Sequence, residues 1–301
     1  MLEAMSWFYL ALLAPLLYAI TVLFDDSLLR FVYKSPYIST TMAGCFGAMP
    51  LLAAFFRPVS IPPDLALLAL LAGFLTITYI FFYFKGLAVE SPSVVIALFS
   101  LAPATLPILA HFLVHEDLRA IQLIGFLIIL VASVGMAAVD IRKLTFSEAL
   151  WPIIVAVILM DAMSLITKHV YEHAQFFSAY MYFCAGLGIA GLVFLLINLP
   201  DNLHNLADIR KILKKVIPVL IIAELFNVAA ELTLNLAISK GPVSLVRAIE
   251  GVQPMFMLLM AVLLYPIAPK FFREAEEGGI IKKLLLMSVV VVGLVIIGVS
   301  S

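Results

Sequence analysis

Residues 86–103, GLAVESPSVVIALFSLAP, and residues 235–254, NLAISKGPVSLVRAIEGVQP, share one pattern about 150 residues apart. In each stretch a Leu-Ala pair precedes a turn, a proline, and a second proline inside an apolar run. Residues 125–135 and 288–298 also match, with small residues ten positions apart in both. Because the matches keep their order along the chain, the sequence predicts a duplicated unit, divided into residues 1–141 and 142–301.

The composition is that of a membrane protein. Hydrophobic residues make up 64% of the chain and charged residues 12%, against roughly 45–50% and 25% in soluble domains. The mean hydropathy is +1.17. A net charge of −1 and the lack of a glycine-rich phosphate loop in the sequence argue against nucleic-acid partners and nucleotide cofactors, and no cofactor is expected. Cys45 and Cys184 lie in apolar segments, where a thiol behaves as a small hydrophobe.

Ten apolar segments are long enough to cross a bilayer, which needs about 20 residues per helix. Five spans per half is an odd number, so the second half must insert inverted relative to the first. The sequence therefore predicts an all-α membrane protein built as a 5+5 inverted repeat, an arrangement that many secondary transporters use for alternating access. The predicted spans are residues 7–24, 37–56, 65–84, 93–114, 118–139, 149–167, 176–199, 216–238, 243–265 and 284–299. Residues 200–215 are predicted to be a solvated connector.

The stretch SPSVVIALFSLAPATLPILAHFLVHEDLRAIQLIGFLIILVASVGM, residues 91–136, resembles the EamA domain of the drug/metabolite transporter superfamily. The resemblance implies a proline within the fourth helix of each repeat, an acidic residue after that helix, and a glycine-bounded fifth helix. In the second repeat, Tyr265 and Pro266 stand near the position expected for the acid. The resemblance implies small-metabolite transport without naming a substrate. The fitting residues are Pro103, Glu116, Gly125 and Gly135 in the first repeat and Pro254 and Gly298 in the second.

Two observations give opposite membrane orientations. Lys and Arg concentrate in the loops on the side away from the N-terminus, so the positive-inside rule predicts both termini outside the cytoplasm. The family resemblance implies both termini inside. It also implies a multi-pass protein of the cell (inner) membrane, surrounded by lipid, and either a monomer or a homodimer.

A polar stripe follows the predicted eighth span. Glu224, Asn227, Glu231 and Asn235 are spaced at i, i+3, i+7 and i+11, which puts them on one helical face. An ionised side chain at the centre of a membrane helix costs roughly 2.5–3.5 kcal/mol on insertion scales, so it is expected to face a partner or a cavity. The stripe is therefore a candidate binding surface for substrate or protons.

The ninth span adds Arg247 and Glu250, one turn apart. At about 1.5 Å per residue from the turn at Lys240, Glu231 and Glu250 lie at similar depth, with Arg247 within reach of both. We predict a Glu231, Arg247, Glu250 cluster. One interpretation is an ion pair that locks the two helices together. Since one Arg neutralises only one Glu, the other interpretation is that the second acid carries a proton or binds a cation.

Asp161 lies near the middle of the sixth span. It is either a second substrate or proton site, or it is paired with a backbone group or with a hydroxyl such as that of Ser164. Tyr79 and Tyr83 on the third span and Ser100 on the fourth are predicted to line the cavity. Aromatic faces beside carboxylates suit an organic cation, whereas ordinary packing and an interfacial aromatic belt explain the same rings without a ligand.

Prolines and histidines give two further patterns. Pro103 and Pro254 remove backbone hydrogen bonds, so the fourth and ninth helices are expected to bend at mid-membrane. His111, His115 and Glu116 have a metal-like spacing. They lack a third and fourth ligand nearby in the sequence, so no metal site is predicted.

Taken together, these patterns predict a secondary transporter of a small metabolite that works by alternating access. Its acidic cavity favours a cationic or zwitterionic substrate, and proton coupling is an open expectation. The alternative is a non-transporting or lipid-handling integral membrane subunit. An enzyme is not predicted, since the spans contain no nucleophile with a neighbouring base in the sequence.

Overall fold

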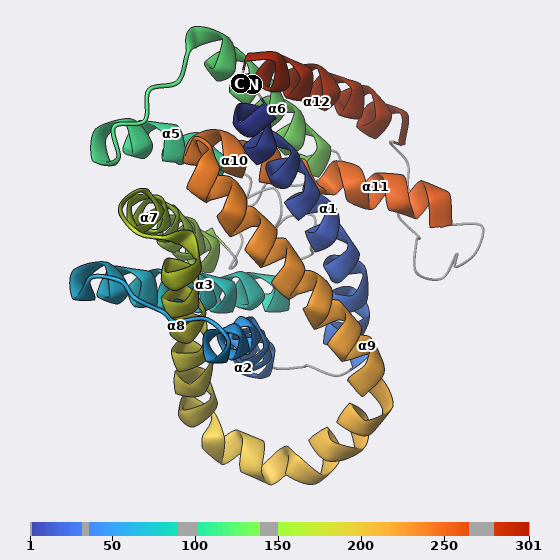
Figure 1. The fold of residues 1–301 in the computed structure, drawn as a ribbon. Helices are drawn as coiled ribbons and strands as arrows, with labels where there is room; N and C mark the ends of the chain where they lie inside the picture. The colour runs from blue at the N-terminus through green and yellow to red at the C-terminus, as the bar shows by residue number, and fades with distance from the viewer. Residues whose placement is uncertain (1, 32–35, 90–101, 139–149, 265–279, 301) are drawn as a thin grey trace.

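The computed structural model describes residues 2–31, 36–89, 102–138, 150–264 and 280–300, and within these ranges every regular element is a helix (Figure 1). The long apolar runs of the sequence form these helices because backbone groups in hydrocarbon must be satisfied within the segment. The elements are α1 (Leu2–Phe31), α2 (Pro36–Gly47), the 3-10 helix η1 (Met49–Phe55), α3 (Pro63–Val89), α5 (Ala102–Leu113), α6 (Ala120–Ala138), α7 (Leu150–His173), α8 (Phe176–Ile197), α9 (Leu199–Lys240), α10 (Val243–Glu250), α11 (Gln253–Leu264) and α12 (Ile280–Ser300).

Five helices in the described ranges are long and apolar enough to cross a membrane. They correspond to the second, third, sixth, seventh and eighth predicted spans, so the prediction of a helical membrane protein is confirmed. The count of ten spans stays a prediction. The five helices are Pro36–Phe55, Pro63–Gly86, Leu150–His173, Phe176–Ile197 and Leu220–Lys240, and shorter apolar helices occupy Ser6–Thr21, Ala120–Ala132 and Leu285–Ser300.

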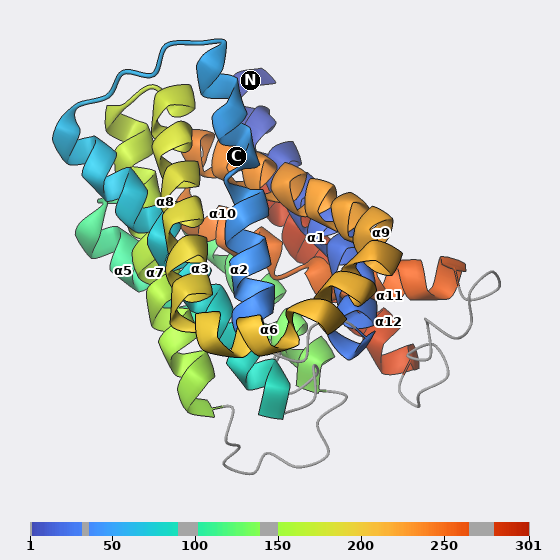
Figure 2. The ribbon, with the colours of Figure 1, turned by 90° about the horizontal axis from the view of Figure 1, so that it is seen from below.

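Helices of the two halves pack against each other throughout the bundle. α1 lies along α9, and α3 packs on both α7 and α8. α2 lies beside α8, as Figure 2 shows from below, and α6 packs on α12. Near the two ends of the chain, the Phe8 ring lies against Gly298 of α12. The halves therefore form one intertwined bundle, in which the first and last helices meet.

The region before the eighth span differs from its prediction. Residues 200–215 were predicted to be a connector, but α9 runs unbroken from Leu199 to Lys240 and curves through its first half (Figure 1). The connector prediction is wrong because it followed polarity alone. Leucine and lysine, with three residues each in this stretch, are good helix formers. Pro200 stands at the start of the helix, where a missing N–H is tolerated.

The predicted ninth span is two helices. α10 ends at Glu250 and α11 begins at Gln253, with Gly251 and Val252 between them. The predicted bend at Pro254 is therefore corrected: the interruption comes before the proline. Pro254 is the second residue of α11, a position that suits proline. Pro103 is likewise the second described residue of α5, and the residues that precede α5 lie outside the described ranges.

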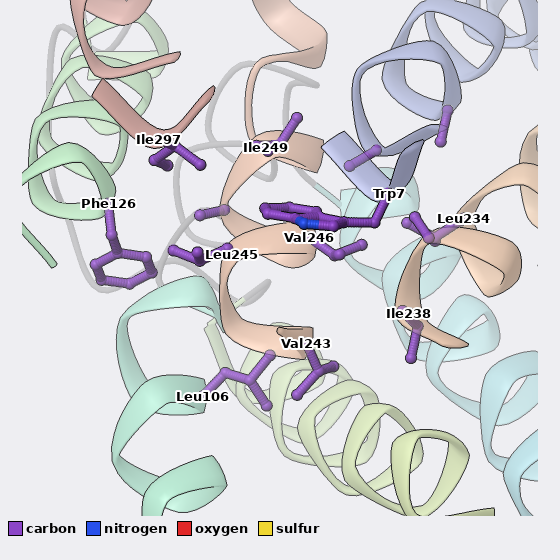
Figure 3. Packing of buried hydrophobic residues seen from close by; sticks show 14 of the residues in the cluster. Trp7, Leu106, Phe126, Leu234, Ile238, Val243, Leu245, Val246, Ile249 and Ile297 are labelled. Atoms are coloured by element: carbon purple, nitrogen blue, oxygen red, sulfur yellow. The ribbon is translucent and has the colours of Figure 1, made fainter. Parts of the chain in front are cut away.

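The short helix α10 is enclosed by the rest of the bundle. Every residue of α10 before Glu250 is buried. Figure 3 shows Leu245, Val246 and Ile249 of α10 close to Trp7 of α1 and to side chains from four further helices. The neighbouring side chains are Leu106 of α5, Phe126 of α6, Leu234 and Ile238 of α9, and Ile297 of α12. This packing fixes the helix that carries Arg247.

Candidate polar site

Arg247 joins α10 to α7 inside the bundle. The residue is only 2% exposed, and its Nη1 donates to Glu250 Oε2 at 2.6 Å. Its Nε donates to Ser164 Oγ at 2.9 Å, and its Nη2 lies 3.6 Å from Met163 Sδ. Arg247 is thus paired with Glu250 of its own helix, and Ser164 and Met163 complete the environment of the guanidinium.

Glu231 is held by neutral donors. The Tyr18 hydroxyl donates to Glu231 Oε2 at 2.5 Å, and Asn235 Nδ2 donates to Oε1 at 2.8 Å. The Tyr171 hydroxyl in turn donates to Asn235 Oδ1 at 2.7 Å. The predicted three-residue cluster therefore consists of two units, the Arg247–Glu250 ion pair and a Glu231 network. They separate because Glu250 lies one turn from Arg247 on the same helix, whereas Tyr18 reaches Glu231 from α1.

Neither tyrosine of this network was predicted as a site residue. Tyr18 stands where the repeat match places Asp161 in the other half, which was the signal available in the sequence. Tyr171 lies near the end of α7 and carried no signal of its own. Which donors reach a buried carboxylate depends on how the helices pack, and helical periodicity within one segment does not contain that information.

Replacing Tyr171 with phenylalanine tests the Glu231 network. The change leaves the buried Asn235 Oδ1 without its donor, so we expect a loss of about 1–3 kcal/mol in the free energy of unfolding. Thermal unfolding in detergent would show a lower midpoint. Tyr182→Phe on α8 is the matched control, because its hydroxyl forms no hydrogen bond with the described residues. Equal midpoints for the two variants would contradict the network.

A small cavity adjoins Glu231 on the side of α2, α3 and α8. Its volume is about 50 Å³, room for a few water molecules at roughly 10–15 Å³ each. Tyr79 belongs to the lining of this cavity, and Tyr83 lies one turn further along α3, outside it. Ser100 lies outside the described residues. The polar lining residues are Tyr18, Thr76, Tyr79, Tyr180, Asn227 and Glu231, and the apolar ones are Ala43, Gly47, Ile77, Ile80, Leu187 and Val228.

The stripe on α9 continues past the cavity. Asn227 lines the cavity, and its Nδ2 donates to Glu224 Oε2 at 3.3 Å. Asn235 lies at the other end of the stripe, where its Nδ2 also donates to the Glu231 carbonyl at 2.9 Å. The four predicted stripe residues are thus joined in two adjacent pairs along one helix.

Asp161 is buried between α5 and α7. It is 3% exposed, and its Oδ2 accepts from the Thr105 hydroxyl at 2.5 Å. Its Oδ1 has no hydrogen-bond partner among the described residues. A hydroxyl partner was one of the alternatives left open by the sequence, and the hydroxyl found is that of Thr105, not that of Ser164. Ser164 donates to the Met160 carbonyl, one turn back on its own helix, at 2.7 Å. The Asp161 contact therefore links the two halves of the chain.

Glu116 and Lys168 lie together at the junction of α9 and α10. Glu116 Oε2 accepts from the Val243 N–H at 2.6 Å and Oε1 from the Ser244 N–H at 3.1 Å. Burial raises the pKa of the Glu116 carboxyl, while its hydrogen bonds to Ser244 and Val243 and the nearby Lys168 act in the opposite direction. Lys168 Nζ donates to the Gly241 carbonyl at 2.9 Å. Lys168 thus binds the end of a helix inside the protein.

The residues with metal-like spacing show a different arrangement. His111 Nδ1 lies 2.8 Å from Asp117 Oδ1 at the surface, and Glu116 binds backbone N–H groups. In the described part of the chain, no three His, Cys, Asp or Glu side chains come together in a way that would hold a metal ion. Cys45 and Cys184 are free thiols.

Comparison with known proteins extends the resemblance found in the sequence. Residues 5–138 match the EamA-like transporter family, which confirms that resemblance for the first half. No curated protein matches the chain. The crystal structure of one protein is similar over 97% of this chain and 95% of its own, with a TM-score of 0.65 at 16% identity. At that identity the likeness concerns the fold, and it includes the half that the family match does not reach.

The family match and the apolar helices together identify an integral membrane protein. Transport of small molecules is the activity that the family match suggests, and proteins of this family are generally not enzymes.

Proposed function

We propose that this protein is a secondary transporter that moves a small cationic or zwitterionic metabolite across its membrane by alternating access. The observation that carries the proposal is the Glu231 carboxylate, which forms part of the wall of a polar cavity inside the bundle. A carboxylate needed only to join helices would gain nothing from facing a cavity. Ionisable residues inside membrane proteins generally mark substrate or ion pathways.

The helix pairing supports an inverted repeat with ten spans. α1 and α7 are the first helices of the two halves, and α3 and α9 are the third. The contact of α1 with α9 corresponds to the contact of α7 with α3 when the halves are exchanged, and both contacts are extensive. The contacts of α2 with α8 and of α6 with α12 each join equivalent helices. Transporters with such repeats rock one bundle against another around a central site.

The cavity lining supports a positively charged group on the substrate. Its described lining includes one carboxylate, from Glu231, three tyrosine side chains and no cationic side chain. Aromatic faces attract organic cations through the ring quadrupole. Arg247 is occupied by Glu250 and Ser164, so its charge is largely neutralised before a substrate arrives.

Flux measurements in liposomes test the proposal. Purified protein would be reconstituted and offered amines, amino acids and sugars, with and without a pH gradient. We expect flux for an amine or amino acid, reduced about tenfold or more by Glu231→Gln, because a charged acceptor is lost. Asp64→Asn, at an exposed position of α3, is the matched control. Absence of flux for every class, or full flux in a Glu231→Gln/Glu250→Gln variant, would refute the proposal.

A lipid-handling role is the second candidate, and one surface feature favours it. An apolar recess of about 460 Å³ opens at α2 and η1, lined by Cys45, Met49, Leu52 and Phe55 among others. Such a recess fits an acyl chain. A lipid handler would exchange a spin-labelled phospholipid between vesicles or leaflets, and Leu52→Trp in the recess would slow that exchange while leaving amine flux unchanged.

A further inference from the structure

The turn between α5 and α6 has an unusual backbone. His115 has a φ of 53°, in the left-handed region that few residues other than glycine adopt. Both Val114 N–H and Glu116 N–H donate to the Ala110 carbonyl, at 3.0 and 3.1 Å. These bonds close the end of α5, and the left-handed residue turns the chain so that the Glu116 carboxylate reaches the start of α10.

Glu116 acts as the N-terminal cap of a helix in the other half of the chain. Its two carboxylate oxygens accept from the N–H groups of Val243 and Ser244, the first two residues of α10. These N–H groups have no partner within their own helix, and a negative charge interacts favourably with a helix N-terminus. The residue at the cap position is Pro242, which offers no side-chain acceptor, so Glu116 supplies the missing one.

Lys168 and Trp7 hold the other side of the same turn. Lys168 Nζ donates to the carbonyls of Ile238 and Gly241, at 3.4 and 2.9 Å, where α9 ends. A positive charge is favourable at a helix C-terminus. A Cβ on Gly241 would lie 2.5 Å from Cδ2 of the Trp7 ring, so the indole packs directly on the turn. Glu116 and Lys168 thus bind adjacent ends of α9 and α10 and form what we call the turn clamp.

We propose that the turn clamp is the gate that keeps this end of the bundle closed, an inference that rests on the proposed transport function. The polar stripe of α9 runs from Asn235, nearest the turn, through Glu231 to Glu224. The cavity touches the stripe at Glu231 and Asn227, away from the turn. Between Glu231 and the turn the bundle is packed with buried apolar side chains, including Leu234, Ile238 and Val243 (Figure 3).

The chemistry of the clamp suits a contact that opens and recloses. The Glu116 carboxylate accepts hydrogen bonds from backbone N–H groups, and the Lys168 ammonium group donates to backbone carbonyls and forms an ion pair with Glu172. Water can replace each of these contacts when the turn moves. Release would free the α9–α10 hairpin from α5 and α7 together. Because that hairpin carries Glu231, Arg247 and Glu250, its movement would expose them on the side of the turn.

The sequence places the clamp in one repeat only. The acid that follows the fourth span is Glu116, whereas Tyr265 and Pro266 stand near the equivalent position after the ninth span. An inverted repeat would put the equivalent contact at the opposite face of the membrane. In the described residues the clamp is therefore found at one face, and the resting state is expected to be closed at that face.

Cysteine labelling tests the gate without any substrate. In a background with Cys45→Ala and Cys184→Ala, Val243→Cys reports on the turn, where residue 243 is fully buried. Ala43→Cys reports on the cavity. A maleimide would be reacted with purified protein in detergent. We expect Glu116→Gln and Lys168→Met each to speed labelling at residue 243 by about tenfold, the scale of a lost charged hydrogen bond, and to slow it at residue 43.

The two reporters separate a gate from simple loosening. Asp117→Asn, an exposed carboxylate in the same loop, is the matched control and should change neither rate. Unchanged labelling at residue 243 in both clamp variants would overturn the gate, and so would faster labelling at both reporters. If Glu116→Gln does not fold, the labelling rates of Lys168→Met and Glu116→Asp test the gate in its place. If labelling becomes faster at residue 243 and slower at residue 43 but no substrate shows flux, the gate is retained and the transport function is rejected. If flux is normal and labelling is unchanged, the transport function is retained and the gate is rejected.

Discussion

Arg247→Met is expected to destabilise the protein by about 3 kcal/mol or more, because removing one partner of a buried ion pair leaves an uncompensated charge. Arg247 is nearly fully buried, and the Glu250 side chain is 21% exposed, so water compensates the glutamate only in part. Ser164 Oγ also loses the donor it accepts from. Thermal unfolding in detergent would measure the loss, and the liposome assay should show no remaining flux.

A double variant separates the charge from the packing. Arg247→Met/Glu250→Gln removes both charges, so we expect it to recover most of the stability that Arg247→Met loses. Flux should stay absent, since the double variant still lacks Arg247. The stability of Arg247→Lys should lie between that of the wild-type protein and that of Arg247→Met. A single ammonium group does not reproduce the bonds to Glu250 and Ser164 together. A double variant as unstable as Arg247→Met would show that side-chain packing, and not the unpaired Glu250, causes the loss.

Pairs on one helix could be predicted from the sequence. Arg247 and Glu250 are three residues apart, and Glu231 and Asn235 are four apart, so each pair shares a face and each forms the expected type of contact. The class of the protein also followed from the sequence, because long apolar runs with few charges form membrane helices.

Partners from other helices could not be predicted in the same way. Tyr18 on Glu231, Thr105 on Asp161 and the Glu116 contact with α10 join residues more than fifty positions apart. Periodicity tells which face of a helix is polar, but it does not tell which helix that face meets. The left-handed backbone conformation of His115, which directs Glu116 toward α10, was also not predicted. Nothing in the sequence around this histidine indicates a positive φ.

Gly73→Ala is expected to cost about 3 kcal/mol, the upper part of the usual range for overpacking, because α3 and α8 touch at this residue. A Cβ on Gly73 would lie 2.0 Å from the Phe183 carbonyl oxygen. Reciprocally, a Cβ on Gly186 would lie 2.1 Å from the Leu70 carbonyl oxygen. Backbone atoms cannot move aside as a side chain can, so the two helices must separate. Small residues permit such close helix approach in membranes.

The same substitution should impair the proposed site. α3 carries Thr76 and Tyr79 and α8 carries Tyr180, all in the cavity lining, so moving the helices apart changes the lining as well as the packing. Gly135→Ala is the matched control on α6. Its nearest contact is Cδ2 of the Leu286 side chain at 3.2 Å, which can rotate away, and alanine favours a helix over glycine by about 1 kcal/mol. We expect a lower unfolding midpoint and reduced flux for Gly73→Ala, against an unchanged or higher midpoint for Gly135→Ala. Equal unfolding midpoints for the two variants would contradict the close approach of α3 and α8 at Gly73.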